Sequence, residues 1–155
     1  MRLPFALTGA RNTEISRQLG NWARQDKRGV AFGSSTGWKL PGGAKRSADA
    51  SWMTKDRIKS LDPAAAAGFW NACPDFVIEL RSRTDRYRVL REKMDEWLAT
   101  GARLGWLIDP ESRSVEVYRP GRETELRTNL MSIEGEGPVA GFVLDLTSVW
   151  EPLPD

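Results

Sequence analysis

The sequence has no histidine and a single cysteine, Cys73, among its 155 residues. Without histidine, Ser-His-Asp and Cys-His catalysis, histidine-ligated zinc, haem on a proximal histidine and histidine-dependent nucleases are all excluded. A lone cysteine excludes intramolecular disulfides, zinc fingers and cysteine-held iron–sulfur clusters. Any metal ion must therefore be bound by carboxylates, carbonyls and water, which are the ligands that Mg²⁺, Mn²⁺ or Ca²⁺ prefer.

The sequence also lacks long apolar runs. No run approaches the ~18 residues that a membrane-spanning helix needs, and the N-terminal apolar region is too short for a signal peptide. We therefore expect a cytoplasmic protein that makes no contact with a membrane. Charges nearly balance, with 23 Lys and Arg against 21 Asp and Glu and a net charge of +2. This slight excess permits contact with a polyanion but does not require it.

Length and hydrophobic periodicity predict one mixed α/β domain spanning residues 1–155. Ile15, Leu19, Trp22 and Ala23 form an apolar stripe at helical spacing, which predicts a helix over about 12–25. A second apolar stripe predicts a helix over about 85–100 that ends at Gly101. The expected strands are an antiparallel meander over 29–33, 35–40 and 45–53, a central strand over 73–81, a pair over 104–110 and 114–119, and a last short strand over 141–146.

The central strand carries a charge inside an apolar run. Residues 76–78 and 80 are all apolar, as expected for a strand covered on both faces, whereas Glu79 is acidic. A carboxylate in this position costs free energy unless something compensates it. Asp49 is a second acid inside an apolar strand pattern, and a divalent cation would relieve the repulsion between two such neighbours. The pattern predicts a metal site at Asp49 and Glu79; structural carboxylates in salt bridges are the alternative.

Asp75 is a third acid near the same strand. Asp75 and Glu79 share one face by parity, but four residues of extended chain separate them by ~13 Å. They cannot ligate one ion, so Asp75 is interpreted as the residue at which the strand begins, after Pro74.

These motifs resemble the Uma2-type restriction endonuclease family, within the PD-(D/E)XK nuclease superfamily. The resemblance covers most of the chain and depends on the order of its motifs. They are Thr8-Gly9, Asn12, Arg46-Ser47-Ala48-Asp49, the run 74–82, Lys93, Gly101, the run 105–110 and the terminal run 141–146.

The resemblance implies a restriction-endonuclease-like αβββαβ core with a mixed central sheet flanked by helices. It implies that Asp49 and Glu79 are metal ligands and catalytic residues. The superfamily pattern has a lysine two residues after the second carboxylate, where this sequence has Arg81. The basic role is expected to move to Lys93 on the following helix, whose long stem can run along the sheet toward Glu79. A solvated lysine is the alternative.

Arginines cluster after the central strand. Arg81, Arg83 and Arg86 are predicted to contact nucleic-acid phosphates, together with Arg88 and Arg91 as one basic edge. A solvated helix face, neutralised by acids at 92, 95 and 96, is the competing interpretation.

Together with the carboxylate pattern, the resemblance implies an endonuclease that hydrolyses DNA phosphodiester bonds through a water activated by Mg²⁺ or Mn²⁺. No nucleotide-binding motif is present, so no organic cofactor is expected. A homodimer is expected because cutting both strands with one site per chain favours two-fold pairing. The alternative is a catalytically inactive module that keeps the fold for DNA binding or protein interaction.

Overall fold

The structure, a computed structural model, describes residues 5–62 and 68–155. Its helices are α1 (Ala6–Asp26), α2 (Lys55–Lys59), α3 (Tyr87–Thr100), α4 (Thr147–Trp150) and the short 3-10 helix η2 (Gly137–Val139). Its strands are β1 (Gly29–Gly33), β2 (Trp38–Lys39), β3 (Lys45–Arg46), β4 (Ala50–Thr54), β5 (Phe76–Leu80), β6 (Leu104–Asp109), β7 (Ser114–Tyr118), β8 (Glu125–Thr128), β9 (Ser132–Glu134) and β10 (Val143–Asp145).

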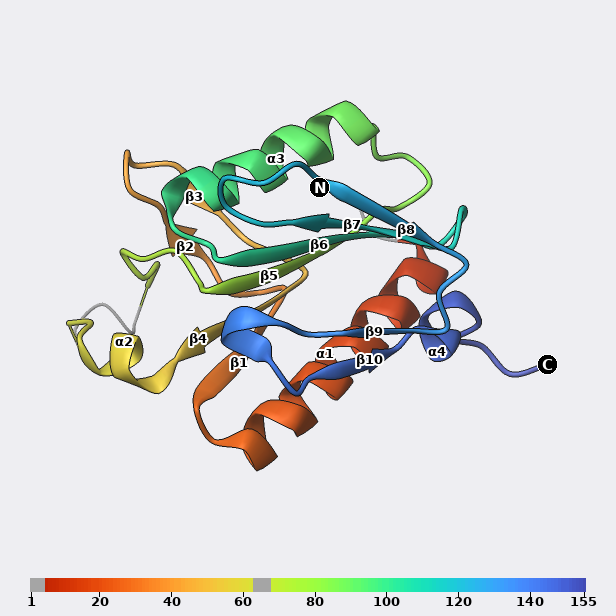
Figure 1. The fold of residues 1–155 in the computed structure, drawn as a ribbon, viewed down its shortest axis with the longest axis horizontal. Helices are drawn as coiled ribbons and strands as arrows, with labels where there is room; N and C mark the ends of the chain where they lie inside the picture. The colour runs from red at the N-terminus through yellow and green to blue at the C-terminus, as the bar shows by residue number, and fades with distance from the viewer. Residues whose placement is uncertain (1–4, 63–67) are drawn as a thin grey trace.

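A six-stranded sheet in the order β1-β4-β5-β6-β7-β8 forms the centre of the molecule (Figure 1). The pair β5 and β6 is parallel and every other neighbouring pair in this sheet is antiparallel. Helix α3 connects the two parallel strands, as a parallel connection requires. Figure 1 shows α3 on one face of the sheet and α1, α4 and the β9–β10 pair on the other. The expected mixed sheet flanked by helices is confirmed.

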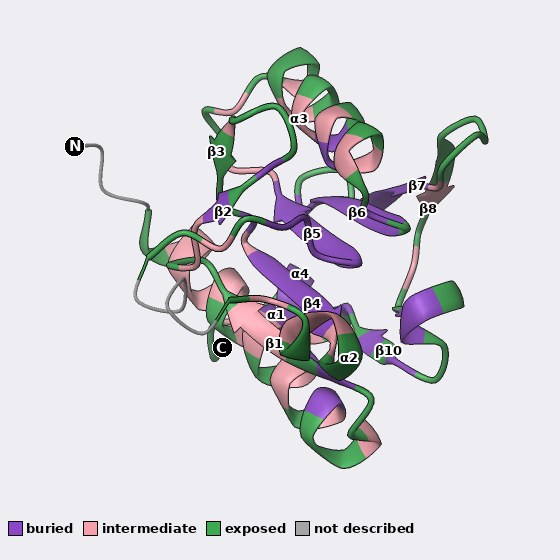
Figure 2. Ribbon diagram, turned by 90° about the vertical axis from the view of Figure 1, so that its left-hand side faces the viewer, coloured by how far each residue is buried: buried purple, intermediate pink, exposed green. Residues whose placement is uncertain are grey.

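Alternation along β5 separates two apolar cores. Phe76, Ile78 and Leu80 pack in the core on the α1 side, whereas Val77 packs on the α3 side. Because successive side chains of a strand point to opposite faces, Glu79 also faces α3. Figure 2 shows that β4, β5 and β6 are buried between these layers. The carboxylate of Glu79, predicted within the central strand, therefore lies beneath α3.

The meander expected over 29–53 is wrong in its pairing. Strand β1 pairs directly with β4, and the segment between them folds into a separate two-stranded sheet of β2 and β3. The strand expected over 45–53 is accordingly split into β3 and β4. The strands β8 and β9 were not expected from the sequence, and the last strand, β10, lies within the range expected for it. Pairing between distant strands is decided by packing that local patterns do not contain.

Helix α1 begins at Ala6, six residues before the expected start at residue 12. Its first turns are supported by Arg11, whose guanidinium donates to the carbonyl oxygens of Val149 (2.9 Å) and Trp150 (3.1 Å). This contact spans nearly the whole chain, so nothing in the local sequence announces it. Within residues 5–62 and 68–155, no helix is both long and apolar enough to cross a membrane.

The buried carboxylate of Asp75 joins three elements of the sheet. It accepts hydrogen bonds from the backbone N–H of Thr54 at 3.0 Å, from Arg57 at 2.9 Å and from Arg103 at 3.2 Å. Its backbone also bonds to Trp52 and to Arg103. Asp75 thus ties the ends of β4 and α2 to the start of β6.

We expect Asp75→Ala to lower the free energy of unfolding by about 2–3 kcal/mol, because a buried acceptor for charged donors is lost. Urea unfolding followed by tryptophan fluorescence measures this change. Asp95→Ala, at an exposed position of α3, is the matched control and should stay within about 0.5 kcal/mol of the parent. Equal effects of the two substitutions would contradict the role of Asp75 in holding the sheet together.

Candidate active site

Asp49 and Glu79 meet at one end of the β4–β5 pair. Ala50 is the partner of Ile78, so the same register places Asp49 opposite Glu79. Asp49 lies in the bend just before β4 and not inside a strand, which corrects the sequence interpretation by one residue. The backbone N–H of Leu80 donates to Asp49 Oδ2 at 2.7 Å. Asp49 is therefore held by the backbone of Leu80, the residue that directly follows Glu79.

Glu79 is held by two donors from α3. Lys93 Nζ lies 2.7 Å from Glu79 Oε2, and Trp97 Nε1 donates to the same oxygen at 3.1 Å. Lys93 and Trp97 are four residues apart, so they stand one above the other on the helix. Lys93 Nζ also donates to the carbonyl oxygen of Ser47 at 2.8 Å. The structure thus brings together Asp49, Glu79 and Lys93.

Within the described residues, each carboxylate keeps one oxygen that accepts no hydrogen bond. In the described part of the chain, no hydrogen bond reaches Asp49 Oδ1 or Glu79 Oε1. Both residues and Lys93 line a cavity of about 330 Å³. The other residues that line it are Phe5, Thr8, Asn12, Leu80, Ser82, Thr84, Asp85 and Leu90.

Asn12 contributes an unsatisfied oxygen to the same cavity. Its Oδ1 atom is buried and has no hydrogen-bond partner among the described residues. A buried polar atom without a partner is costly, so a bound water or ion would stabilise it. The N-terminal half of α1 therefore places a side chain with an unsatisfied acceptor in the cavity lining.

The environment of Asp49 strongly favours the protonated acid. Burial, and secondly the charge of Glu79, raise the pKa of Asp49 to about 7, despite the opposing bond from the Leu80 N–H. Burial, which disfavours the charged carboxylate, is the main cause of this shift, and the neighbouring charge of Glu79 adds to it. A cation between the two carboxylates would offset the contribution of Glu79.

The donor set fits a small divalent cation that prefers oxygen ligands. Within residues 5–62 and 68–155, no three acidic or cysteine side chains converge on one point. Mg²⁺ is commonly bound through one or two carboxylates and keeps several waters. The free oxygens of Asp49 and Glu79 match that arrangement.

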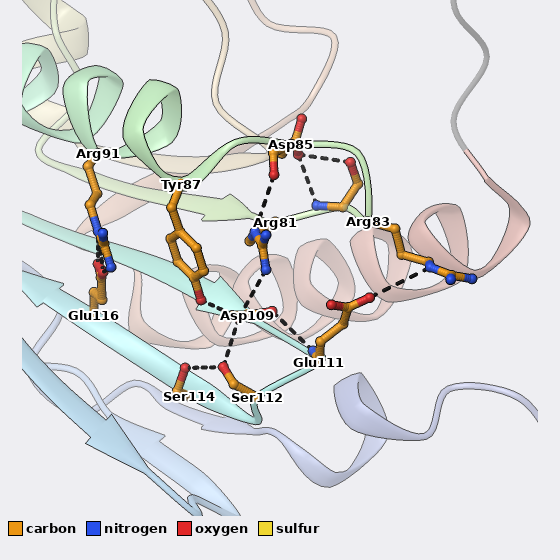
Figure 3. Close-up of polar contacts among 11 residues, drawn as sticks. Arg81, Arg83, Asp85, Tyr87, Arg91, Asp109, Glu111, Ser112, Ser114 and Glu116 are labelled. Carbon is orange, nitrogen blue, oxygen red and sulfur yellow. Dashed lines mark hydrogen bonds and ion pairs between the residues drawn. The ribbon is translucent and has the colours of Figure 1, made fainter.

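Arg81 does not line this cavity. Its Nη1 lies 3.4 Å from Asp109 Oδ2, its Nε donates to the carbonyl oxygen of Asp85 at 3.3 Å, and its guanidinium stacks 4.1 Å from the centre of the Tyr87 ring (Figure 3). The Tyr87 hydroxyl also donates to Asp109. Arg81 thus connects the β5–α3 loop to the end of β6.

The other predicted phosphate contacts differ in their exposure. Arg83 is exposed and lies 3.6 Å from Glu111 (Figure 3). Arg86 is exposed and pairs with no acid in the described structure. Arg88 and Arg91 are neutralised by Glu92 and Glu116, respectively. In the described structure, fewer of the predicted arginines are therefore free of acidic partners than the sequence suggested.

Sequence reasoning missed three contributors to this region. From the sequence, no side-chain contact in this region was assigned to Trp97, Asp109 or Asn12. The sequence spacing contained part of this information. Trp97 lies one helical turn from Lys93, and Asp109 shares with Leu107 the sheet face that packs against α3.

Comparisons with known proteins identify the family and the fold of the chain. Residues 2–147 match the Uma2 family, described as "Putative restriction endonuclease". A crystal structure of a putative nuclease belonging to DUF820 from Anabaena variabilis has a similar fold, with a TM-score of 0.80 and 22% identity over 96% of this chain and 83% of that chain. No curated protein matches the chain. Because the family match covers nearly the whole sequence, the chain belongs to the Uma2 family.

Proposed function

We propose that this protein is a metal-dependent endonuclease that hydrolyses phosphodiester bonds in DNA. The observation that carries the proposal is the pair of free carboxylate oxygens, on Asp49 and Glu79, that line one cavity beside Lys93. Membership of a family described as restriction endonucleases supports the reaction class.

In this proposal Asp49 and Glu79 hold Mg²⁺ or Mn²⁺ through their free oxygens. The ion, when bound, lowers the pKa of a coordinated water and offsets charge on the attacked phosphate. Lys93, which Glu79 holds at the cavity wall, orients the attacking water or stabilises the negative charge that develops on the phosphate oxygens.

Arg83 and Arg86 are proposed to contact phosphates beside the cavity, since both are exposed. Arg81 adds positive charge at the base of this edge and holds the loop that carries the other two. Two copies of the chain, related by a two-fold axis, would place one cavity on each strand of a duplex.

A second candidate function is a catalytically inactive DNA-binding or protein-interaction module. Two contacts favour it: Lys93 forms an ion pair with Glu79, and Arg81 is engaged by Asp109. Salt-bridged side chains of this kind also occur as plain scaffold. Metal binding and cleavage distinguish the two candidates.

We expect Glu79→Gln to reduce cleavage of supercoiled plasmid in Mg²⁺ or Mn²⁺ by at least about 100-fold, beyond the 10–100-fold typical of residues that only orient a metal ligand. Chelator should abolish cleavage by the parent. Glu92→Gln, at an exposed position of α3, is the control and should cut at the parental rate. Undiminished cleavage by Glu79→Gln would place the active site elsewhere.

We expect Lys93→Met to lower kcat by about 10²–10³-fold and to change KM little, because its proposed contact forms in the transition state. The combined variant Arg83→Ala/Arg86→Ala should instead raise KM and reduce the salt dependence of DNA binding. Steady-state cleavage of a labelled duplex at several salt concentrations separates the two patterns. A Lys93 variant with a changed KM alone would reduce that lysine to a phosphate contact.

We expect Asp49→Asn to raise the melting temperature of the metal-free protein at pH 7 by about 2–4 °C. In a chain of this size, this shift corresponds to a gain of ~1 kcal/mol in the free energy of unfolding. The folded-state pKa of Asp49 lies above its unfolded value, so the parent loses stability as pH rises from about 4 to about 7. The variant should lack this loss.

Mn²⁺ should stabilise the parent by mass action and the Asp49 variant only weakly. Differential scanning calorimetry across pH, with and without Mn²⁺, measures both effects. Strong destabilisation of the metal-free variant, with no response of the parent to Mn²⁺, would assign Asp49 to the scaffold.

A further inference from the structure

Three hollows follow one another along α1. The carboxylate cavity includes Asn12; a second hollow of about 540 Å³ also includes Asn12; and a third of about 530 Å³ shares Ser16 and Arg17 with the second. We call the second and third hollows together the α1 groove. It is lined by Asn12, Thr13, Ser16, Arg17, Gly20, Asn21, Ala23 and Arg24 of α1, by 29–31 and 33–36 after it, and by Lys55.

The groove is about 18 Å long from Asn12 to Arg24, at the helical rise of ~1.5 Å per residue. The section that begins at Asn12 is lined by hydroxyl groups from Thr13, Ser16 and the loop 33–36. Hydroxyl and amide side chains at such positions commonly contact phosphate oxygens. The section next to the carboxylate cavity therefore has the chemistry of a backbone-binding track.

The far section combines a floor of small residues with a positive rim. Gly20, Ala23 and Ala31 line the floor, and a Cβ built on Gly20 would meet nothing within 4 Å. Arg24 and Lys55 line the same hollow, are exposed, and pair with no carboxylate in the described structure. These residues come from α1, β1 and the start of α2, and β1 contacts both helices.

We propose that the α1 groove binds a single strand of DNA that leaves the carboxylate cavity. This inference rests on the proposed function, because continuity with that cavity is one of its two supports. The other is charge: unpaired cations above an apolar floor suit phosphates together with unpaired bases. A duplex presents mainly phosphates to a protein surface, so it would leave the small-residue floor unused.

The groove length corresponds to about five nucleotides at the ~3.4 Å spacing of a stacked strand. Affinity should therefore rise with oligonucleotide length up to about this size and change little beyond it. Strand β1 lies at the edge of the sheet and borders the groove. Another protein bound along this edge strand is therefore the main competing occupant of the groove.

The test uses Gly20→Glu, which places bulk and negative charge in the groove. The Cβ has free space and glutamate has a higher helix propensity than glycine, so α1 should fold. Gly9→Glu is the matched control, because Gly9 lies in the same helix, has equally open space and does not line the groove. Circular dichroism and melting temperature check both folds.

Binding is measured by fluorescence anisotropy with a labelled 12-nucleotide single strand in chelator, where the metal-dependent reaction cannot proceed. We expect at least 10-fold weaker binding for Gly20→Glu and parental binding for Gly9→Glu. Arg24→Ala/Lys55→Ala should bind about 25-fold more weakly at 0.1 M salt, the loss expected for two phosphate contacts on a single strand. The charge-matched pair Lys59→Ala/Arg122→Ala, outside the groove, should match the parent.

Equal binding by the Gly20 and Gly9 variants would overturn the inference, as would tighter binding of the corresponding duplex or no binding by the parent. A Gly20→Glu variant altered only in oligomeric state by sedimentation would identify a protein contact instead. Plasmid cleavage that depends on Glu79, with unchanged binding by Gly20→Glu, would overturn the groove and leave the nuclease proposal standing. Weakened binding by Gly20→Glu without any cleavage by the parent would support the groove and overturn the nuclease.

Discussion

Repulsion between the carboxylates of Asp49 and Glu79 is the constraint around which this molecule is organised. The two acids lie opposite each other on paired strands, and three donors hold them there: the Leu80 N–H on one, and Lys93 with Trp97 on the other. Burial, together with the charge of Glu79, still raises the pKa of Asp49 to about 7. The free oxygens leave a position where a cation would lower the energy of the whole arrangement.

Helix α3 supplies most of the polar partners on its face of the sheet. Lys93 and Trp97 reach Glu79, while Tyr87, nearer the start of the helix, donates to Asp109. The opposite face of the same strands is apolar and packs against α1 and the C-terminal elements. One face therefore provides the packing that stabilises the fold, and the other holds buried charges that hydrophobic packing alone would not tolerate.

The departure at Arg81 has a structural explanation. Its guanidinium stacks on Tyr87 and contacts Asp109, so it is directed along the sheet and away from the carboxylate cavity. The ammonium group beside Glu79 comes from α3 through Lys93. A long, flexible lysine stem can reach across from a packed helix, whereas the planar arginine is suited to the stacked, carboxylate-bound position it occupies.

The sequence by itself determined the features that depend on local periodicity. Two-residue alternation placed Glu79 on the face of its strand opposite to Ile78 and Leu80, and the helical repeat placed Lys93 one turn from Trp97. Only the tertiary structure decided that β1 pairs with β4, that α1 extends to Ala6 through the contacts of Arg11 with α4, and that Asn12 consequently lines the cavity. The physical reason is distance along the chain: these features depend on contacts between segments far apart in sequence, and no short-range pattern encodes which distant partner will bury a given face.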